Sequence, residues 1–210
     1  GALSSLKGTC NEHREGAMKR RRDPHGFAPE RSRTVMLLID VLNDFDFPQA
    51  GKLLRFALPA ARRIAALKKR FARRNVPAVY VNDNFGRWRS DFKEQVERCT
   101  ADESPGAGIT RLLLPQHDDY FVLKPKHSAF YSTSLDVLLA YLGAERLILT
   151  GFAADICVLY TANDAYMRDF ELAVPGDCVA SESTSAKRIA LAQMKRFLHA
   201  DVRPSARIRS

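Results

Sequence analysis

Apolar residues along the chain form short runs that alternate with longer stretches of helical periodicity. The first run, residues 34–41, is apolar without alternation, which is typical of a central strand buried on both faces. Further runs predict strands at residues 77–82, 119–123, 146–150 and 171–174, with a short edge strand beginning at 201–202. Helical spacing predicts helices at 59–75, 134–143, 155–168 and 182–199, with Pro59 in the first turn of its helix.

This alternation of strands and helices predicts βαβ units. The fold class is therefore α/β: a three-layer, doubly wound, mostly parallel sheet of about six strands with helices on both faces. Residues 34–210 form one predicted domain, and residues 1–33 are polar and basic enough to predict a flexible arm. Ligands in such sheets bind at the carboxyl ends of the strands, so chemistry is expected there.

Composition narrows the class of protein. The 210 residues are 46% hydrophobic, enough for one sizeable core. The cysteines are widely spaced and contain no CxxC pair, which favours a reducing, cytoplasmic compartment: Cys10, Cys99, Cys157 and Cys178. No stretch is apolar enough to span a bilayer, and no secretory signal is recognisable, so no membrane partner is expected.

The formal net charge is +9, with basic clusters at residues 19–22 and 62–74. One interpretation is binding to nucleic acid or an acidic surface. The other is a solvated tail and a solvated helix face. Ile64, Leu67 and Phe71 place an apolar stripe on the second cluster, which favours the solvated helix and argues against nucleic acid.

Chemically useful side chains follow the predicted strands. They are distant in sequence but are expected to meet at one edge of the sheet: Asp40, Asn82, Asp83, Asn84, Lys124 and Cys157. Taken singly, such an aspartate is usually a cap, a lysine a surface residue, and a cysteine a packing residue. Taken together, a carboxylate, an ammonium and a thiol outline an acyl-transfer site. A helix start after Cys157's strand would lower the thiol's pKa and offer N–H groups to an oxyanion.

Three motifs carry a family resemblance: IDVLNDF, LKPKHSAF and LTGFAADICVLYTANDAYMRDFELAVPGDCVAS. In their order and spacing they resemble the isochorismatase-like cysteine hydrolases, a superfamily that includes nicotinamidases, N-carbamoylsarcosine amidases and ureidoacrylate amidohydrolases. The resemblance covers residues 34 to about 210. It implies Asp40 as general base, Lys124 as catalytic lysine with Lys126 as second choice, and Cys157 as nucleophile.

The resemblance also implies a cis peptide bond between Phe152 and Ala153. That bond would aim the Ile156 and Cys157 N–H groups at the substrate oxygen as an oxyanion hole. Family members usually assemble as dimers or larger homo-oligomers, and the same is expected of this chain.

Two departures from the family pattern narrow the substrate. Isochorismatases proper have glycine at the nucleophile position, so Cys157 argues against isochorismate hydrolysis. Nicotinamidases have Asp-x-His after the second strand, where this chain has Asp83-Asn84-Phe85. The histidines show no metal-ligand spacing. Neither a metal nor an organic cofactor is therefore expected.

The segment NDNFGRWRSDF stands where nicotinamidases bind their metal. It suggests a substrate pocket formed with residues from neighbouring segments: Asn82, Asn84, Phe85, Trp88 and Phe130, with Arg87 or Arg89 meeting a substrate carboxylate. The alternative is a capped loop packed by its own aromatics. His127, beside Lys124, is open to either a pocket or a structural role.

The predicted function is cysteine-dependent hydrolysis of a carbon–nitrogen bond in a small amide or ureido compound, through a thioester. The alternative is a non-catalytic α/β binding module whose basic arm contacts nucleic acid or an acidic partner. A third interpretation, thiol redox chemistry, lacks a resolving cysteine near Cys157 in sequence, although Cys178 could lie close to it in space.

Overall fold

We describe a computed structural model of the chain, which covers residues 22–23, 26–27, 31–48, 50–84 and 91–210. The strands are β1 (Arg22–Asp23), β2 (Gly26–Phe27), β3 (Thr34–Ile39), β4 (Ala78–Asp83), β5 (Tyr120–Lys124), β6 (Arg146–Phe152), β7 (Glu171–Ala173) and β8 (Val179–Ala180). The α-helices are α1 (Ala50–Ala72), α2 (Phe92–Thr100), α3 (Ala107–Leu112), α4 (Leu135–Leu142), α5 (Leu159–Tyr166) and α6 (Thr184–Phe197). A π-helix spans Ala154–Val158, and 3₁₀ turns span Gly176–Cys178 and Ser205–Arg207.

The main sheet has six parallel strands in the order β5-β4-β3-β6-β7, with β8 paired to the end of β6. The chain adds strands on one side of β3 and then crosses to its other side with β6. This reversal between β3 and β6 creates a crevice at their carboxyl ends. The predicted fold class is confirmed. The antiparallel pair β1–β2 is separate from this sheet.

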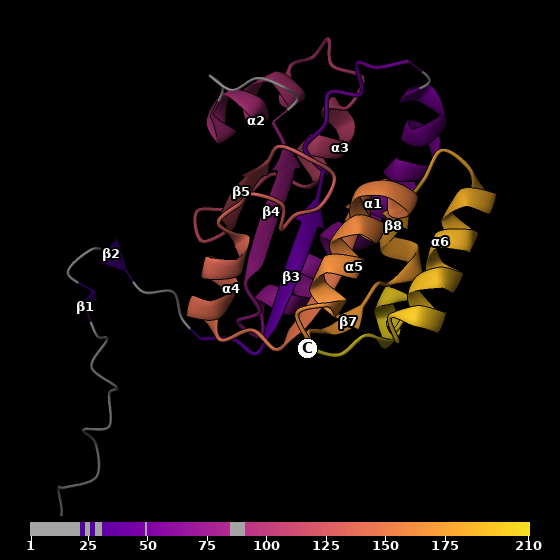
Figure 1. Cartoon of the computed structure of the whole chain (residues 1–210). Coiled ribbons are helices and arrows are strands. Elements are labelled where there is room, and N and C mark those ends of the chain that lie inside the picture. The colour runs from indigo at the N-terminus through magenta and orange to yellow at the C-terminus, as the bar shows by residue number, and fades with distance from the viewer. Residues whose placement is uncertain (1–21, 24–25, 28–30, 49, 85–90) are drawn as a thin grey trace, which may run out of the picture.

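Two apolar cores fill the space between the sheet and its helices. Val35, Leu37 and Ile39 of β3 pack in the core covered by α4, α5 and α6, the face turned to the viewer in Figure 1. Met36 and Leu38 point the other way, into the core beneath α1 and α3. Alternate residues of each strand thus serve opposite cores, which explains why the strand sequences are apolar throughout.

The helix predicted at 59–75 begins earlier than expected, because α1 starts at Ala50 and holds Pro59 in its interior. Leu53 and Ala57 continue the buried stripe toward the N-terminus. Pro59 itself is exposed, so the ring meets solvent. The free energy gained by burying the longer apolar stripe therefore exceeds the free energy lost with the backbone hydrogen bond that proline cannot make.

Other boundaries also differ from the prediction. Neither α2 nor α3 was expected, nor was β8, and the strand expected at 201–202 is a single parallel bridge between Asp201 and Ala173. The helix predicted at 155–168 is a π-helix followed by α5. The backbone of Ser32 and Arg33, at the end of the predicted arm, already hydrogen-bonds the domain. Every helix in the described ranges is too short or too polar to traverse a lipid bilayer.

Candidate active site

Three of the predicted site residues meet at the crevice between β3 and β6. Asp40 follows β3 directly, Lys124 ends β5, and Cys157 lies in the π-helix after β6. The carboxyl ends of β3 and β4 lie at the upper end of the sheet in Figure 1. The topology therefore brings together residues that are 117 positions apart in the sequence, from 40 to 157.

Lys124 is the centre of this cluster and is 0% exposed. Its Nζ lies 2.9 Å from Asp40 Oδ2 and 3.5 Å from Asp83 Oδ2. The same ammonium donates to Cys157 Sγ at 3.6 Å and to the Lys126 carbonyl oxygen at 3.1 Å. Lys126, the second choice for a catalytic lysine, has an exposed side chain and contributes this carbonyl instead. One buried cation thus links two carboxylates to the thiol.

The backbone at Asp40 is left-handed, with φ of 50°. Regular alternation would direct its side chain with Met36 and Leu38 into the core beneath α1. The left-handed turn instead lets the carboxylate reach Lys124 on the opposite side. Its second oxygen, Oδ1, accepts the Asp83 N–H at 2.7 Å, which fixes the carboxylate's orientation.

The environment shifts the ionisation of all three groups. Burial raises the pKa of Asp40, although the Lys124 charge opposes the shift. Burial and then the Asp40 charge raise the pKa of Cys157, again against Lys124. Burial alone would lower the pKa of Lys124, but Asp40, Cys157 and Asp83 outweigh it and raise that pKa. The expectation of a thiol with a lowered pKa at a helix start is therefore wrong. These shifts favour a charged Lys124 and a neutral Cys157 thiol, with the Asp40 carboxyl group beside them to exchange the proton.

The outer side of the thiol faces His127. Its Nδ1 lies 3.8 Å from Cys157 Sγ, and its ring packs on Tyr160 with centroids 5.5 Å apart. Ile156 and Tyr160 are 42% and 55% exposed. Because Lys124 and Asp40 close the inner side, a reagent must reach the sulfur past these outer residues.

The expected oxyanion hole is partly occupied by an internal bond. The peptide bond between Phe152 and Ala153 is cis, where the family resemblance places one. The Ile156 N–H donates to the Ala153 carbonyl oxygen at 3.2 Å. A substrate oxygen would have to share or displace that bond at Ile156.

The residues predicted to line a substrate pocket do not lie together in the structure. Asn82 is fully buried and donates to the Leu42 carbonyl oxygen at 2.7 Å, so it supports the loop after β3 instead of lining a pocket. Alternation along β4 explains this correction, since Asn82 points to the α1 side. Phe130 is likewise a core residue, stacked on Phe170. Asn84 is half-buried beside the site, and its N–H donates to the Lys124 carbonyl oxygen at 3.1 Å.

Four residues of that predicted pocket lie outside the described residues: Phe85, Arg87, Trp88 and Arg89.

Two residues near the site, Asp83 and His127, have no defined role in the prediction from the sequence. Asp83 could have been found from alternation, because it shares the face of Val79 and Val81. The sequence left His127 open between a pocket role and a structural role, because its position depends on a loop.

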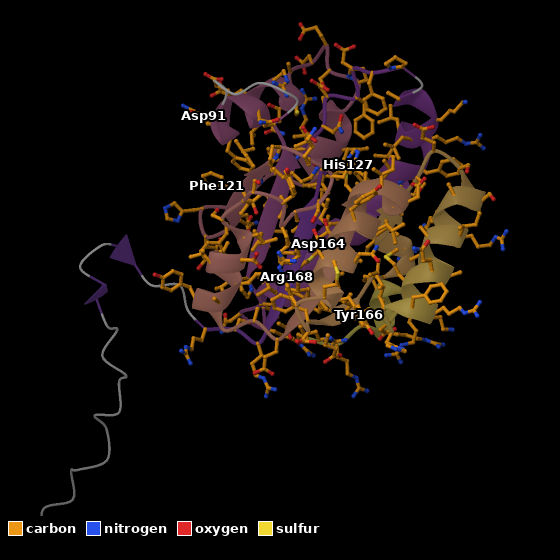
Figure 2. The ribbon with its side chains drawn as sticks, in the orientation of Figure 1. Asp91, Phe121, His127, Asp164, Tyr166 and Arg168 are labelled. Atoms are coloured by element: carbon orange, nitrogen blue, oxygen red, sulfur yellow. The ribbon has the colours of Figure 1, made fainter. Side chains whose placement is uncertain are left out.

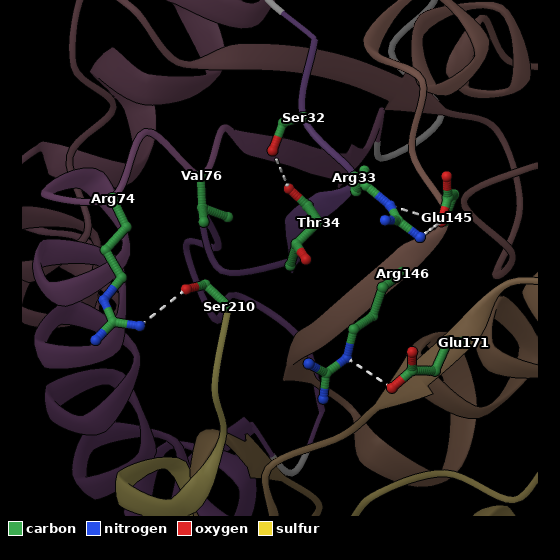
Figure 3. A pocket seen from close by; sticks show the side chains of 9 residues that line it. All are labelled: Ser32, Arg33, Thr34, Arg74, Val76, Glu145, Arg146, Glu171 and Ser210. Carbon is green, nitrogen blue, oxygen red and sulfur yellow. Dashed lines mark hydrogen bonds and ion pairs between the residues drawn. The ribbon is translucent and has the colours of Figure 1, made fainter.

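A hollow with a volume of about 440 Å³ lies at the opposite end of the sheet (Figure 3). It surrounds the first residues of β3 and β6 and is lined by Ser32, Arg33, Thr34, Arg74, Val76, Glu145, Arg146, Glu171 and Ser210. Two of its arginines are paired with glutamates, and the third donates to a serine hydroxyl. None of the predicted site residues lines this hollow. Among the described residues, no cluster of three His, Cys, Asp or Glu side chains is arranged to hold a metal ion.

Comparison with known proteins identifies the family. The family model for the isochorismatase domain matches residues 34–203. The chain belongs to the isochorismatase family. The uncharacterised isochorismatase family protein YaaI of Bacillus subtilis is 39% identical over 168 residues, covering 80% of this chain and 92% of that protein.

More distant relatives differ in length and in described activity. Isochorismatase of Bacillus subtilis is 31% identical over 175 residues, which is 79% of this chain but only 54% of that protein. Among solved structures, N-carbamoylsarcosine amidase of Thermoplasma acidophilum aligns with a TM-score of 0.66 and 25% identity, covering 85% of this chain and 100% of that one. These relatives are named for different reactions. The reaction of this chain therefore has to be inferred from its own site residues.

Proposed function

We propose that this protein is a cysteine-dependent hydrolase that cleaves a carbon–nitrogen bond in a small amide or ureido compound. The observation that carries the proposal is the contact of one buried ammonium, Lys124, with both Cys157 and Asp40. A raised thiol pKa beside a carboxylate suits a nucleophile that is deprotonated during attack and stays neutral before it.

In the proposed reaction, the Cys157 sulfur attacks the substrate carbonyl carbon while its proton passes to Asp40. The carbonyl oxygen becomes an oxyanion, which the Cys157 and Ile156 N–H groups hold once Ile156 releases its bond to Ala153. Lys124 stabilises the negative charge that moves through the site. The tetrahedral intermediate collapses, the carbon–nitrogen bond breaks, and Asp40 returns the proton to the leaving amine. The acyl group then remains on sulfur as a thioester.

A thiol at position 157 favours amide cleavage over isochorismate hydrolysis. A covalent nucleophile is useful for acyl transfer, because it divides carbonyl hydrolysis into two easier steps. Hydrolysis of a vinyl ether such as isochorismate has no acyl group to transfer. The likeness to N-carbamoylsarcosine amidase, which covers the whole of that structure, supports the same choice.

The test is turnover of a panel of N-carbamoyl amino acids, ureido acids and primary amides, with isochorismate as a competing candidate and ammonia release as the readout for C–N cleavage. Cys157→Ala should lower turnover of any amide substrate by at least about 10⁴-fold, as loss of a covalent nucleophile does elsewhere. Cys178→Ser, which alters a buried thiol in the other core, is the matched control and should retain turnover. Undiminished activity in Cys157→Ala, or turnover of isochorismate alone, would contradict the proposal.

A further inference from the structure

We propose that His127 is the base that activates water for release of the acyl group, so that the two halves of the reaction use different bases. This inference rests on the proposed function, because it concerns the thioester on Cys157. It starts from the two sides of the sulfur. Lys124 lies on the buried side at 3.6 Å and His127 on the exposed side at 3.8 Å.

Asp40 lies on the buried side of the sulfur, and both of its oxygens already have partners. Its Oδ1 accepts the Asp83 N–H at 2.7 Å, and its Oδ2 faces Lys124 at 2.9 Å. The carboxylate is buried and the His127 side chain is exposed, so a water that enters from solvent meets His127 first. The acyl carbon sits one bond from that sulfur, and its open face is the face from which the substrate arrived.

His127 borders that open face. Its side chain is exposed, and its Nδ1 points toward the sulfur. With its proton on Nε2, the imidazole accepts from a water through Nδ1. A water bound there lies next to the thioester carbon, within the reach expected of a general base.

The loop that carries His127 is held on both sides of the residue. On one side, Lys124 Nζ donates to the Lys126 carbonyl oxygen at 3.1 Å. On the other side, the Ala129 N–H donates to Thr161 Oγ1 at 3.0 Å, and that hydroxyl donates to the Cys157 carbonyl oxygen at 2.7 Å. One threonine thus couples the loop to the nucleophile's own backbone.

A second tie comes from Ser128, whose hydroxyl donates to Asp164 on α5. Figure 2 shows Asp164 below His127, with Arg168 farther along the chain. These bonds place the imidazole beside the thiol before any substrate binds. Such preorganisation is what an effective general base requires.

The proposed step balances without another reactant. The water oxygen bonds to the acyl carbon while one water proton moves to His127 Nδ1. The tetrahedral intermediate then breaks its carbon–sulfur bond, and the electron pair leaves with sulfur. The proton on His127 passes to the thiolate, which restores the Cys157 thiol and the neutral imidazole. The product is a carboxylic or carbamic acid.

The experiment uses p-nitrophenyl acetate, which acylates cysteine and releases p-nitrophenolate. The full-length protein is mixed with this ester, quenched in acid at timed intervals, and the acetylated fraction of Cys157 is measured by peptide mass spectrometry. His127→Gln should be acetylated at the wild-type rate but lose the acetyl group about 10²-fold more slowly or worse, the usual worth of a general base. His117→Gln, which removes an exposed imidazole before the amino end of β5, should match wild type.

Hydroxylamine separates a catalytic role from a structural one, because this strong nucleophile attacks thioesters without a base. It should restore acetyl release in His127→Gln to the rate that it produces in wild type. Normal deacetylation in His127→Gln, or a failure of acetylation itself in that variant, would overturn the assignment. Absence of Cys157 acetylation in the wild type would instead contradict the proposed function.

Discussion

Replacing Asp40 by asparagine should increase the reactivity of the Cys157 thiol while it strongly lowers turnover. The two side chains have the same shape, and asparagine tolerates the left-handed backbone found here at φ of 50°. The substitution therefore removes a charge with little change in structure. Lys124 keeps a carboxylate neighbour, since Asp83 Oδ2 lies 3.5 Å from its Nζ.

The magnitude follows from the distances to Lys124. With an effective dielectric constant near 20, opposite charges 2.9 Å apart, as for Lys124 and Asp40, attract by about 6 kcal/mol. An ammonium and a thiolate 3.6 Å apart, as for Lys124 and Cys157, would attract by about 5 kcal/mol. In the wild type, the Asp40 charge and hydrogen bond raise the thiol's pKa against this attraction. One pKa unit corresponds to about 1.4 kcal/mol. If removal of the Asp40 charge lets the thiolate gain a third of its attraction to Lys124, the pKa of Cys157 falls by about one unit. The thiolate fraction at neutral pH, and with it the alkylation rate, then rises about tenfold.

The assay is the rate of iodoacetamide labelling of each cysteine as a function of pH, read by peptide mass spectrometry. Because the wild-type thiol has a raised pKa, its labelling should still be increasing with pH above neutrality. In Asp40→Asn the same curve should move to lower pH, while turnover falls by about 10²–10⁴-fold through loss of the base. Buried Cys99 and Cys178 serve as internal references. Slower or unchanged labelling of Cys157 in the variant would refute this account of the thiol.

Further substitutions test the charge balance and the backbone. Lys124→Met should slow labelling of Cys157, the opposite of Asp40→Asn, and faster labelling would contradict the role of the ammonium. The same variant should lower the free energy of unfolding in urea by about 3–5 kcal/mol, because it leaves the buried Asp40 carboxylate without its ion-pair partner. Gly151→Ala should cost at least about 2 kcal/mol, because φ is 119° and a Cβ would lie 1.9 Å from the Ile39 carbonyl oxygen. Gly51→Ala, with open space around it in α1, should instead stabilise by about 0.5 kcal/mol, and equal unfolding free energies for the two variants would refute the steric argument.

The apolar pattern of the sequence predicted the main strands well because they are buried on both sides and need continuous apolar runs. The same pattern failed to predict elements that have few buried residues. In α2 only Gln95 and Cys99 are buried, and the apolar stripe of Phe92, Val96 and Cys99 is too short to predict a helix from the pattern alone. A local signal was present, since Asp91 caps the helix by accepting from the Glu94 N–H at 2.8 Å, the spacing of a capping box.

The candidate site was predictable as far as topology determines it. Parallel strands place their final residues at one edge of the sheet. That rule is why the sequence predicts that Asp40, Lys124 and Cys157 lie close together. Topology does not say which of two adjacent polar residues faces that group. Asn82 and Asp83 follow each other on β4, yet Asn82 bonds to the loop on the α1 side and Asp83 lies near Lys124.

Alternation would have separated Asn82 from Asp83, but the same rule would have excluded Asp40. Lys124 and Asp83 share the face of the odd-numbered apolar residues of β3, and Asp40 is even-numbered. Only the left-handed residue at the end of β3 brings the base to the nucleophile's side. Asparagine, aspartate and glycine are the residues that adopt this conformation readily, and of these only aspartate carries a carboxylate. The identity of residue 40 is therefore constrained twice, once by the backbone turn and once by the chemistry. A glutamate there would satisfy the chemistry alone.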